Sequence, residues 1–387
     1  MRMTMPKANY TRRPPKIMVV AGEASGDWLG AGLMQALRKQ YPDAQFVGLG
    51  GEAMIAQGLK PAFALSELSV MGILEVLPHI PRILKRINYL ADVARIERID
   101  VLVTIDAPDF CLRVARKIKH ELDVPCVHYV SPHVWAWRKG RIKKMARYLD
   151  HVLVLFPFEE KVYAGSGLAC TFVGHPVTER LAAVAPKGAT RHLHQPRRLA
   201  LAPGSRLHEV QRMMPPMAAA VRLLLKDFPD LEVVLPVADH FNPRHFEPYV
   251  GLPITYVRGA ERYAVLQTCD AALATSGTVN LELAMLGLPM VVGYRLAGLT
   301  YWLAKALVKV RFFSPVNLVA GKLVVPELLQ GQVNGQKLAE IAGDLLKKSV
   351  ARKAQLEGLA DVRAKLSGAG QHPSQRAAEV VAGYLPK

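Results

Sequence analysis

Cysteine is scarce in this sequence, with four residues at Cys111, Cys126, Cys170 and Cys269. Because they lie far apart and form no Cys-x-x-Cys pair, the sequence indicates neither a zinc knuckle nor a redox pair. Isolated thiols of this kind are typical of a reducing compartment.

Long apolar runs are also missing. No stretch of 18 apolar residues occurs, which argues against a membrane-spanning helix. The N-terminus is basic, but the apolar run that follows it, 17–21, is too short for the core of a signal peptide. We therefore expect a cytoplasmic protein, with association at a membrane surface left open.

Acidic residues are outnumbered, with 32 Asp and Glu against 50 Lys and Arg, for a net charge of +18. Such a surface attracts nucleic acid, phospholipid headgroups or phosphorylated substrates. The sequence carries no RNP, zinc-finger or helix-turn-helix pattern, so we expect no nucleic-acid partner and keep a basic nucleic-acid-binding protein as a distant alternative. The hydrophobic fraction of 51% over 387 residues excludes global disorder and suffices for two domains.

Short apolar segments alternate with helical patterns in both halves of the chain. Strands are predicted at 16–21, 101–105 and 124–130, and the alternation restarts with strands at 199–202 and 271–274. This order predicts an α/β protein with two doubly wound, Rossmann-like domains, whose ligands bind at the carboxyl ends of the strands in a cleft between the domains. The expected parts are a disordered basic extension (1–15), an acceptor-binding domain (16–181), a linker (182–198), a nucleotide-binding domain (199–365) and a C-terminal helix (366–387) that could return to the first domain.

Two loops in the first half of the chain follow predicted strands and contain acidic residues. The turn at 22–27 lacks the Gly-x-Gly-x-x-Gly pattern, and Glu23 and Asp27 would repel a pyrophosphate. The turn suits a substrate with hydroxyls and amides, with Glu23 and Ser25 as candidate contacts, or else Ser25 or Asp27 caps the following helix. Asp106 closes an apolar strand and is a candidate general base, with a turn role as the alternative. Asp109 is expected to cap the next helix.

A third loop of the first half gathers aromatic and basic residues after a strand. The segment 131–138 contains His133, Trp135, Trp137 and Arg138. We interpret Trp135 and Arg138 as candidates for contact with a sugar or an acceptor. An aromatic corner of the core is the alternative interpretation.

The second half carries two glycine-containing turns between a strand and a helix. Gly204, Ser205 and Arg206 offer backbone amides and a guanidinium to an anion. A capping box would require Glu or Gln at position 208, where the chain has His208, so Glu209 is expected to act only as an acid in the first turn.

The second of these turns precedes the helix that follows the strand at 271–274. Ser276, Gly277 and Thr278 suit a diphosphate, and Glu282 could accept hydrogen bonds from ribose hydroxyls. The alternative is a helix cap followed by a solvated acid.

These two turns together favour a nucleotide diphosphate bound by helix N-termini and Arg206. The Asp-x-Asp metal clamp of many sugar-nucleotide transferases is absent, so we expect neither a metal nor a cofactor. With Asp106 as base, the layout suits sugar transfer by direct displacement, which inverts the anomeric carbon.

Two basic amphipathic stretches, 71–90 and 299–311, suit a headgroup layer. The second contains Lys305 and Lys309. The alternative is a pair of ordinary amphipathic helices whose apolar faces pack on the core and whose basic faces are exposed to solvent.

Ten segments, in this order and spacing, resemble the lipid-A-disaccharide synthases, a family of inverting GT-B glycosyltransferases (family 19). The segments are GEASGD (22–27), VMGILEVL (70–77), IDAPDF (105–110), HYVSPHVWAWR (128–138), FPFE (156–159), FVGHP (172–176), PGSRLHEV (203–210), SGTVNLE (276–282), MVVGYR (290–295) and NLVAG (317–321). The resemblance implies condensation of UDP-2,3-diacylglucosamine with 2,3-diacylglucosamine 1-phosphate to a β-1,6-linked disaccharide and UDP. It also implies a peripheral protein on the anionic cytoplasmic face of the inner membrane.

The resemblance assigns roles to particular residues. Asp106 matches the candidate base, Arg206 and the segment 276–282 match the UDP site, and Asn317 matches a further nucleotide-site residue. The family usually places proline directly before this asparagine, whereas here Val316 intervenes. A UDP-sugar epimerase of the same fold is the main alternative, and a homodimer is left open.

Overall fold

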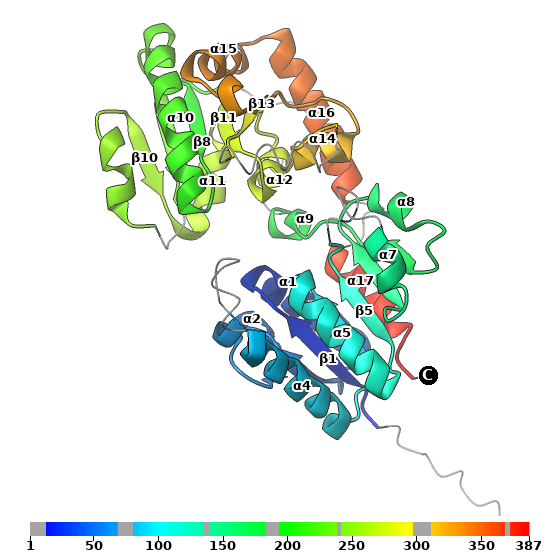
Figure 1. Cartoon of the computed structure of the whole chain (residues 1–387). Helices are drawn as coiled ribbons and strands as arrows, with labels where there is room; N and C mark the ends of the chain where they lie inside the picture. Colours follow the sequence, from blue (N-terminus) through cyan, green and yellow to red (C-terminus); the bar gives the residue numbers. More distant parts are fainter. Residues whose placement is uncertain are drawn as a thin grey trace, which may run out of the picture. The chain divides into compact units, whose positions relative to one another are not determined.

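The computed structural model describes residues 13–68, 80–132, 134, 140–182, 193–237, 241–296, 311–367 and 372–386. The chain forms two compact units (Figure 1). Unit 1 comprises residues 1–155, 159–173 and 373–387, and unit 2 comprises residues 156–158 and 174–372. Residues 1–12 of the expected N-terminal extension and residues 183–192 of the expected linker lie outside the described residues.

Unit 1 contains a seven-stranded parallel sheet in the order β3-β2-β1-β4-β5-β6-β7. Its strands are β1 (Lys16–Ala21), β2 (Gln45–Leu49), β3 (Leu59–Pro61), β4 (Val101–Ile105), β5 (Cys126–Tyr129), β6 (His151–Val154) and β7 (Ala169–Phe172). Its helices are α1 (Ala24–Gln40), α2 (Glu52–Ala56), η1 (Leu65–Leu68), α4 (Ile80–Glu97), α5 (Pro108–Leu122), α7 (Gly140–Met145), α8 (Glu159–Tyr163) and α17 (Pro373–Ala382).

Unit 2 contains a six-stranded parallel sheet in the order β10-β9-β8-β11-β12-β13. Its strands are β8 (Arg198–Ala202), β9 (Glu232–Pro236), β10 (Ile254–Val257), β11 (Ala271–Thr275), β12 (Met290–Tyr294) and β13 (Glu327–Leu329). Its helices are α9 (Val177–Arg180), α10 (Leu207–Asp227), η3 (Pro243–Tyr249), η4 (Gly259–Glu261), α11 (Arg262–Gln267), α12 (Thr278–Met285), α14 (Pro315–Ala320), η5 (Gln330–Gln332), α15 (Gly335–Leu345) and α16 (Val350–Ser367).

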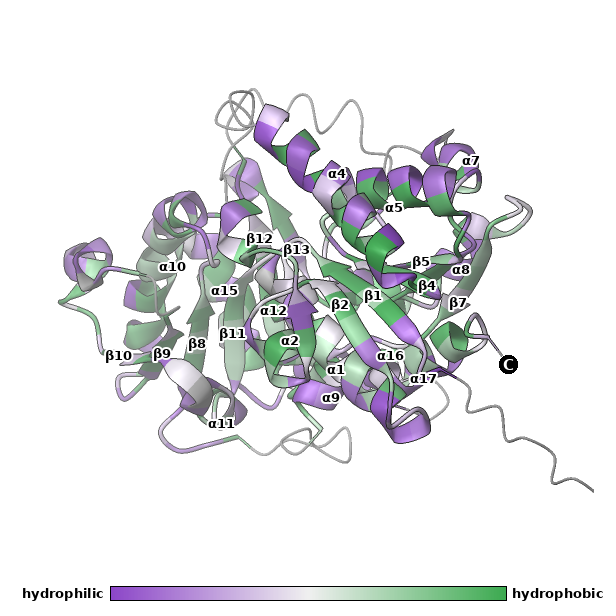
Figure 2. Cartoon of the chain, turned by 90° about the horizontal axis from the view of Figure 1, so that it is seen from below, coloured by the Kyte–Doolittle hydropathy of each residue, from purple (hydrophilic) through white to green (hydrophobic). Residues whose placement is uncertain are grey.

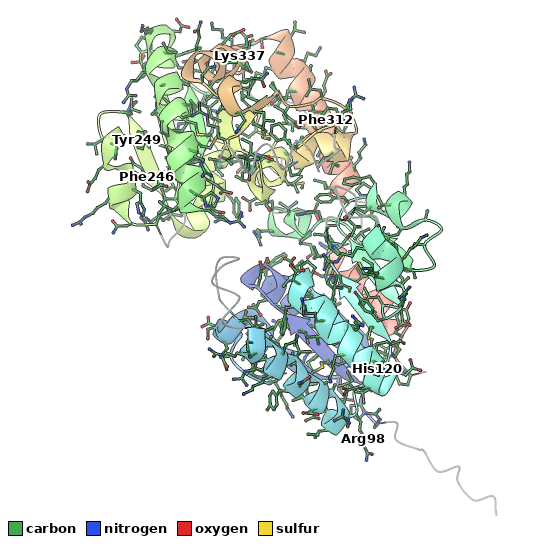
Figure 3. All side chains as sticks on the ribbon, viewed as in Figure 1. Arg98, His120, Phe246, Tyr249, Phe312 and Lys337 are labelled. Carbon is green, nitrogen blue, oxygen red and sulfur yellow. The ribbon has the colours of Figure 1, made fainter. Side chains whose placement is uncertain are left out.

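Helices cover both faces of each sheet, which is why the strands are apolar runs rather than alternating patterns. Figure 2 shows hydrophobic strands in both units and hydrophilic residues on the outer sides of the helices. In unit 2, α10 and α15 pack on one face of the sheet, and α9, α12, α14 and α16 pack on the other. The aromatic residues Phe246 and Tyr249 lie on η3, in the connection between β9 and β10 (Figure 3).

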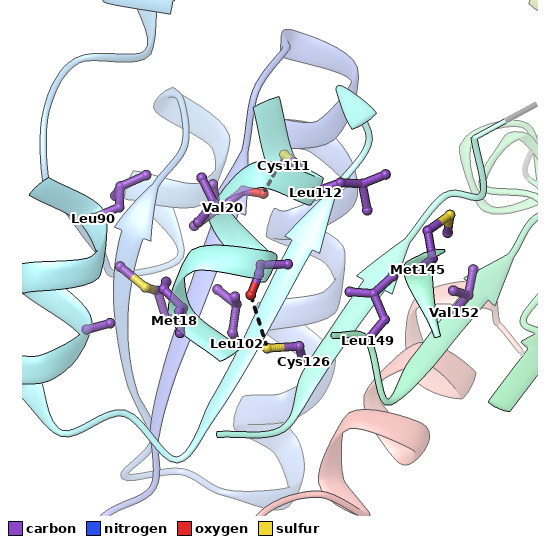
Figure 4. Close-up of a cluster of buried hydrophobic side chains, with 14 of the residues drawn as sticks. Met18, Val20, Leu90, Leu102, Cys111, Leu112, Cys126, Met145, Leu149 and Val152 are labelled. Atoms are coloured by element: carbon purple, nitrogen blue, oxygen red, sulfur yellow. Dashed lines mark hydrogen bonds between the residues drawn. The ribbon is translucent and has the colours of Figure 1, made fainter. Parts of the chain in front are cut away.

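The core of unit 1 shows how alternate strand residues serve the two faces. Met18 and Val20 of β1 pack with Leu90 of α4 and Leu112 of α5 (Figure 4), while their neighbours in β1 point to the opposite face. On that opposite side α1 packs against α17, which is formed by the end of the chain. Both sheet faces are therefore closed only when α17 is in place.

The strand orders place one switch point in each unit. In unit 1, strand order reverses between the adjacent strands β1 and β4, and in unit 2 between β8 and β11. At such a point the loops after the two strands leave in opposite directions and open a crevice at the carboxyl edge of the sheet. The loops at 22–25 and 106–107 flank the first crevice, and the loops at 203–206 and 276–278 flank the second.

Within the described parts of the chain, no helix combines the length and the apolar character needed to cross a membrane. Residues 69–79 and 297–310, which make up much of the two amphipathic stretches and include Lys305 and Lys309, lie outside those parts. The described helix α4 exposes Leu84, Tyr89 and Ile96 to solvent.

Candidate active site

Asp106 lies directly after β4, in a backbone conformation that residues other than glycine rarely adopt. Its φ is 53° and that of Ala107 is 38°, both left-handed, and the Asp106 amide donates to the Tyr129 carbonyl of the neighbouring strand at 2.9 Å. Such a conformation persists where surrounding contacts enforce it, and residues held in it cluster at functional sites. The turn therefore holds a half-buried carboxylate at the edge of the sheet.

The structure brings Ser25 and Asp106 together, although 80 residues separate them. The Ser25 hydroxyl, in the first turn of α1, donates to Asp106 Oδ2 at 2.9 Å. No described residue donates a hydrogen bond to Oδ1. One oxygen of the carboxylate is thus oriented by the protein, and the other is available to a substrate.

Gly22 makes this close approach of the two loops possible. A Cβ atom at Gly22 would lie 2.5 Å from the Cβ of Ala107, which is closer than real Cβ contacts allow. Any larger residue at position 22 would therefore displace the turn that carries Asp106.

Other acids near this crevice serve different purposes than expected. The Asp27 carboxylate does not cap α1; it accepts hydrogen bonds from the amides of Gly51 (2.7 Å), Ala53 (3.1 Å) and Met54 (3.0 Å) and so caps α2. The expectation that Asp109 caps α5 is wrong, because Ala107 occupies the cap position and the Asp109 side chain is 92% exposed in the first turn.

The remaining acceptor-side candidates are described only in part. Glu23 is exposed at the cap position of α1. Trp135 and Arg138, together with His133 and Trp137, lie outside the described residues.

Sequence reasoning missed the buried His128, which lies on β5 beside the site strand. Its Nδ1 shares a 2.8 Å hydrogen bond with Thr104 Oγ1 on β4. Burial, aided by the positive charge of Arg141, lowers the pKa of His128 to about 3. The imidazole is therefore neutral over the physiological range. The strand pattern alone could not reveal this, since a histidine within an apolar strand carries no sign of its partner.

This neutral histidine predicts acid sensitivity of unit 1. Below about pH 6.5 the unfolded chain takes up a proton at His128 that the folded chain binds only near pH 3, so the free energy of unfolding falls by about 1.4 kcal/mol per pH unit in that window. We expect His128→Asn to remove this part of the slope in urea denaturation between pH 4 and 6.

The exposed His120, at the end of α5 (Figure 3), provides the matched control. His120→Asn should leave the slope unchanged, and the similarly buried His175 of unit 2 contributes equally to every variant. An unaltered slope in His128→Asn would contradict the prediction.

In unit 2, the turn after β8 is organised around Glu209. Gly204 has a φ of 119°, and a Cβ there would lie 2.5 Å from Glu209 Oε2. That oxygen accepts hydrogen bonds from the amides of Ser205 (3.0 Å) and Arg206 (3.2 Å). The helix begins one residue later than its sequence suggested, with Arg206 at the cap position. Glu209, three residues further on, accepts a hydrogen bond from the Arg206 amide, which is the half of a capping box that this position supplies. The expectation that Glu209 acts only as an acid in the first turn is therefore wrong.

The turn after β8 still offers backbone amides and a guanidinium that can bind an anion. The amides of Leu207 and His208 open the 21-residue helix α10 and have no acceptor within the helix. The Arg206 side chain is 72% exposed and lies 3.5 Å from Glu209 Oε1. These groups and the positive end of the helix dipole form a site suited to phosphate.

The turn after β11 is held by its own side chains. The Ser276 hydroxyl donates to the Phe313 carbonyl at 2.9 Å, and the buried Asn280 accepts from the Gly277 amide (3.2 Å) and donates to the Thr275 carbonyl (3.0 Å). Thr278 is exposed at the first position of α12. The Ser276 hydroxyl thus orders the loop, while Thr278 faces solvent.

Glu282, one turn further along α12, is not a solvated acid. Its side chain is 13% exposed, and its Oε1 accepts a hydrogen bond from the Tyr263 hydroxyl at 2.8 Å. Arg180 approaches the same oxygen at 3.4 Å.

Asn317 is fully occupied within unit 2. It is buried, its Nδ2 donates to the Val325 carbonyl (2.8 Å) and to Glu327 Oε1 (2.7 Å), and its Oδ1 accepts from the amides of Val324 (2.7 Å) and Val325 (3.0 Å). A side-chain amide has two donors and two acceptor lone pairs, so none is left for a ligand in this conformation. Asn317 therefore joins α14 to the start of β13.

Glu327 is the residue of this region that sequence reasoning missed. Its carboxylate accepts from the amides of Phe313 (3.0 Å) and Ser314 (2.9 Å) as well as from Asn317. It thereby places the Phe313 carbonyl that Ser276 binds. No spacing rule could have found it, because its partners are backbone amides more than ten residues away.

Among the described residues, no three His, Cys, Asp or Glu side chains are grouped so that they could hold a metal ion. The arrangement can bind a diphosphate through peptide amides and a guanidinium in unit 2. In unit 1 it can present an oriented carboxylate to a hydroxyl.

Comparison with known proteins gives a match over nearly the whole chain. The family model described as Lipid-A-disaccharide synthetase matches residues 17–381. The lipid-A-disaccharide synthase of Myxococcus xanthus is 42% identical over 381 residues, covering 96% of this chain and 98% of the relative. That of Rhodospirillum centenum is 38% identical over 384 residues, covering 97% and 96%.

Solved structures with low sequence identity share the fold. Acinetobacter baumannii MurG superposes with a TM-score of 0.60 at 14% identity, covering 96% of this chain and 100% of that chain. A putative UDP-N-acetylglucosamine 2-epimerase from Listeria monocytogenes gives 0.63 at 18% identity, covering 95% and 94%. The expected α/β GT-B fold is confirmed, and because transferases and epimerases both share it, the fold alone does not separate them.

Proposed function

Because this chain belongs to the lipid-A-disaccharide synthetase family, as its motifs predicted, we propose that it condenses UDP-2,3-diacylglucosamine with 2,3-diacylglucosamine 1-phosphate. The products are the β-1,6-linked disaccharide 1-phosphate of lipid A biosynthesis and UDP. The observation that carries the proposal is the family match from residue 17 to residue 381.

Unit 2 holds the donor in this proposal. The diphosphate of UDP binds at the N-termini of α10 and α12 and to Arg206, whose fork of donors suits phosphate oxygens. As the bond between the anomeric carbon and the diphosphate breaks, negative charge builds on the leaving oxygen. The amides and Arg206 are already oriented toward that charge, so they stabilise the transition state without rearranging.

Unit 1 activates the acceptor. Asp106 Oδ1 takes the proton from the 6-hydroxyl of the acceptor sugar, while Ser25 keeps the carboxylate oriented through Oδ2. The hydroxyl oxygen forms its bond to the anomeric carbon on the side opposite the leaving UDP. One displacement inverts that carbon and accounts for a β product from an α-linked donor.

Asn317 and Glu327 act as positioning residues in this scheme. Asn317 has no donor or acceptor left, and Glu327 accepts hydrogen bonds from Asn317 and from the backbone of the segment to which Ser276 donates. Where the family usually places proline directly before this asparagine, this chain has Pro315 at the first position of α14, behind the Ser314 cap.

A direct assay tests the reaction. The purified protein is incubated with both acylated sugars, and products are followed by mass spectrometry. We expect the disaccharide phosphate and UDP in equal amounts. A 2-epimerised UDP-sugar formed without disaccharide would instead establish the epimerase alternative and overturn the proposal.

The acylated substrates and the net charge of +18 support contact with an anionic membrane surface at the cytoplasmic face of the inner membrane. We expect replacement of both Lys305 and Lys309 by glutamate to reduce co-sedimentation with vesicles rich in anionic lipid. The exposed Lys348 and Lys353, changed to glutamate together, make the same change in charge elsewhere and serve as the control. Equal binding by the two double variants would exclude 299–311 from the contact.

A further inference from the structure

Several donors converge on one oxygen of Glu282. The Tyr263 hydroxyl donates to Oε1 at 2.8 Å, and Arg262 Nη2 lies 2.5 Å from the same hydroxyl. Arg180 reaches Oε1 at 3.4 Å and Arg262 at 3.8 Å. All four residues belong to unit 2.

The direction of each hydrogen bond in this group follows from the chemistry of its ends. A guanidinium can only donate and a carboxylate can only accept. The Tyr263 oxygen therefore accepts from Arg262, and its proton is directed to Glu282. The Arg262 guanidinium also lies 4.5 Å from the centroid of the Tyr263 ring, which adds a cation–π contact that holds the tyrosine in place.

The other oxygen of Glu282 is left open. No described residue donates a hydrogen bond to Oε2, although the side chain is only 13% exposed. Glu282 follows Thr278 by four residues, so both lie on one face of α12. Oε2 is therefore available one helical turn from the proposed diphosphate site, where the ribose attached to that diphosphate presents its hydroxyls.

Two arginines beside one carboxylate would ordinarily take both of its oxygens, since Arg–carboxylate pairs favour two parallel hydrogen bonds. The Tyr263 hydroxyl prevents this by occupying Oε1 at a distance shorter than that of either guanidinium. It keeps the carboxylate from rotating into the arginines.

We infer that Tyr263, held by Arg262, is a positioning residue that orients Glu282 so that its Oε2 accepts a hydrogen bond from the ribose 2′-hydroxyl. The inference deepens the proposed function and rests on it. Tyr263 acts through Glu282 and sets the preference of the nucleotide site for a ribonucleotide over a 2′-deoxyribonucleotide.

The test compares UDP with 2′-deoxy-UDP by calorimetry on the full-length protein. We expect the unmodified protein to bind UDP about tenfold or more tightly, as suits a hydrogen bond to a charged group. Tyr263→Phe should bring the two affinities to within about threefold of each other by weakening UDP, and should leave 2′-deoxy-UDP within about twofold of its original value. The KM for the UDP-sugar should rise in step while kcat changes little.

Tyr249→Phe is the matched control. Tyr249 lies on η3 (Figure 3). It packs against the cluster on the opposite face of the sheet from Tyr263. This variant should keep the full preference for UDP.

A second variant guards against misfolding of the first. The Arg262 side chain is 40% exposed, so Arg262→Gln leaves the core intact while removing the donor that orients the tyrosine. It should lower the preference for UDP at least threefold. A preference unchanged in both variants, or an equal weakening of both nucleotides by Tyr263→Phe, would overturn the inference.

The proposed function fails in a different way. Absence of UDP binding to the unmodified protein would contradict the nucleotide site itself. Tight UDP binding without preference over 2′-deoxy-UDP would leave that site standing and overturn only the role of Tyr263.

Discussion

Asp106→Asn is expected to lower turnover by about a hundredfold to ten-thousandfold, the range attributed to a general base. The amide keeps the size of the side chain and can still accept the Ser25 hydrogen bond through its oxygen. It has no basic oxygen left with which to take the proton of the acceptor. The effect should therefore appear in kcat, with the affinity for UDP near normal because the nucleotide groups lie in unit 2.

Asp109→Asn provides a matched control, since it removes the same charge three residues further on from a side chain that is 92% exposed. Its turnover should stay close to that of the unmodified protein. Steady-state rates of disaccharide formation and calorimetry with UDP measure the two properties separately. Full activity in Asp106→Asn would remove this residue from the mechanism, and an equal loss in both variants would point to local charge rather than to a base.

Arg206→Ala should weaken UDP binding by about 1.5–3 kcal/mol, or about 10- to 150-fold, as expected for a charged hydrogen bond. Among the described residues, the exposed guanidinium has only a 3.5 Å ion pair with Glu209 to lose, so the stability of unit 2 should barely change. Arg206→Lys should recover part of the affinity, because it restores the charge without the fork geometry.

The control for this prediction is Arg222→Ala, an exposed arginine further along the same helix. It should leave the calorimetric affinity for UDP unchanged. If Arg206→Ala bound UDP normally, the phosphate site would have to lie elsewhere than at the start of α10.

The sequence predicted the architecture well because buried parallel strands are apolar runs with clear ends. The strands at 16–21 and 101–105 match β1 and β4 residue for residue. Knowing that ligands bind at the carboxyl edge of such a sheet was enough to single out Asp106 and Ser25, and the structure places them in direct hydrogen-bond contact.

Side-chain partners were harder to predict than strands. Asp27 is of a residue type that often caps helices and lies near the start of α1. It caps α2 instead, because the intervening strand β2 brings the Gly51 amide close to it. The role of Glu209 was predicted wrongly because the expected start of α10 was one residue too early. Arginine is not a usual cap residue, so the sequence did not indicate that Arg206 precedes the helix. The hydrogen bonds of Asn317 and Glu327 could not be predicted, because they join loops that approach each other only in the folded chain.

The return of α17 to unit 1 sets an order on folding during synthesis. Its buried face includes Ala377, Ala378 and Val381, and α1 carries a glycine at position 32 whose Cβ would lie 2.5 Å from Ser374 Oγ. A ribosome has translated all of unit 2 before these residues emerge. The first unit to begin is thus the last to be completed, and one side of α1 stays uncovered until α17 has been made.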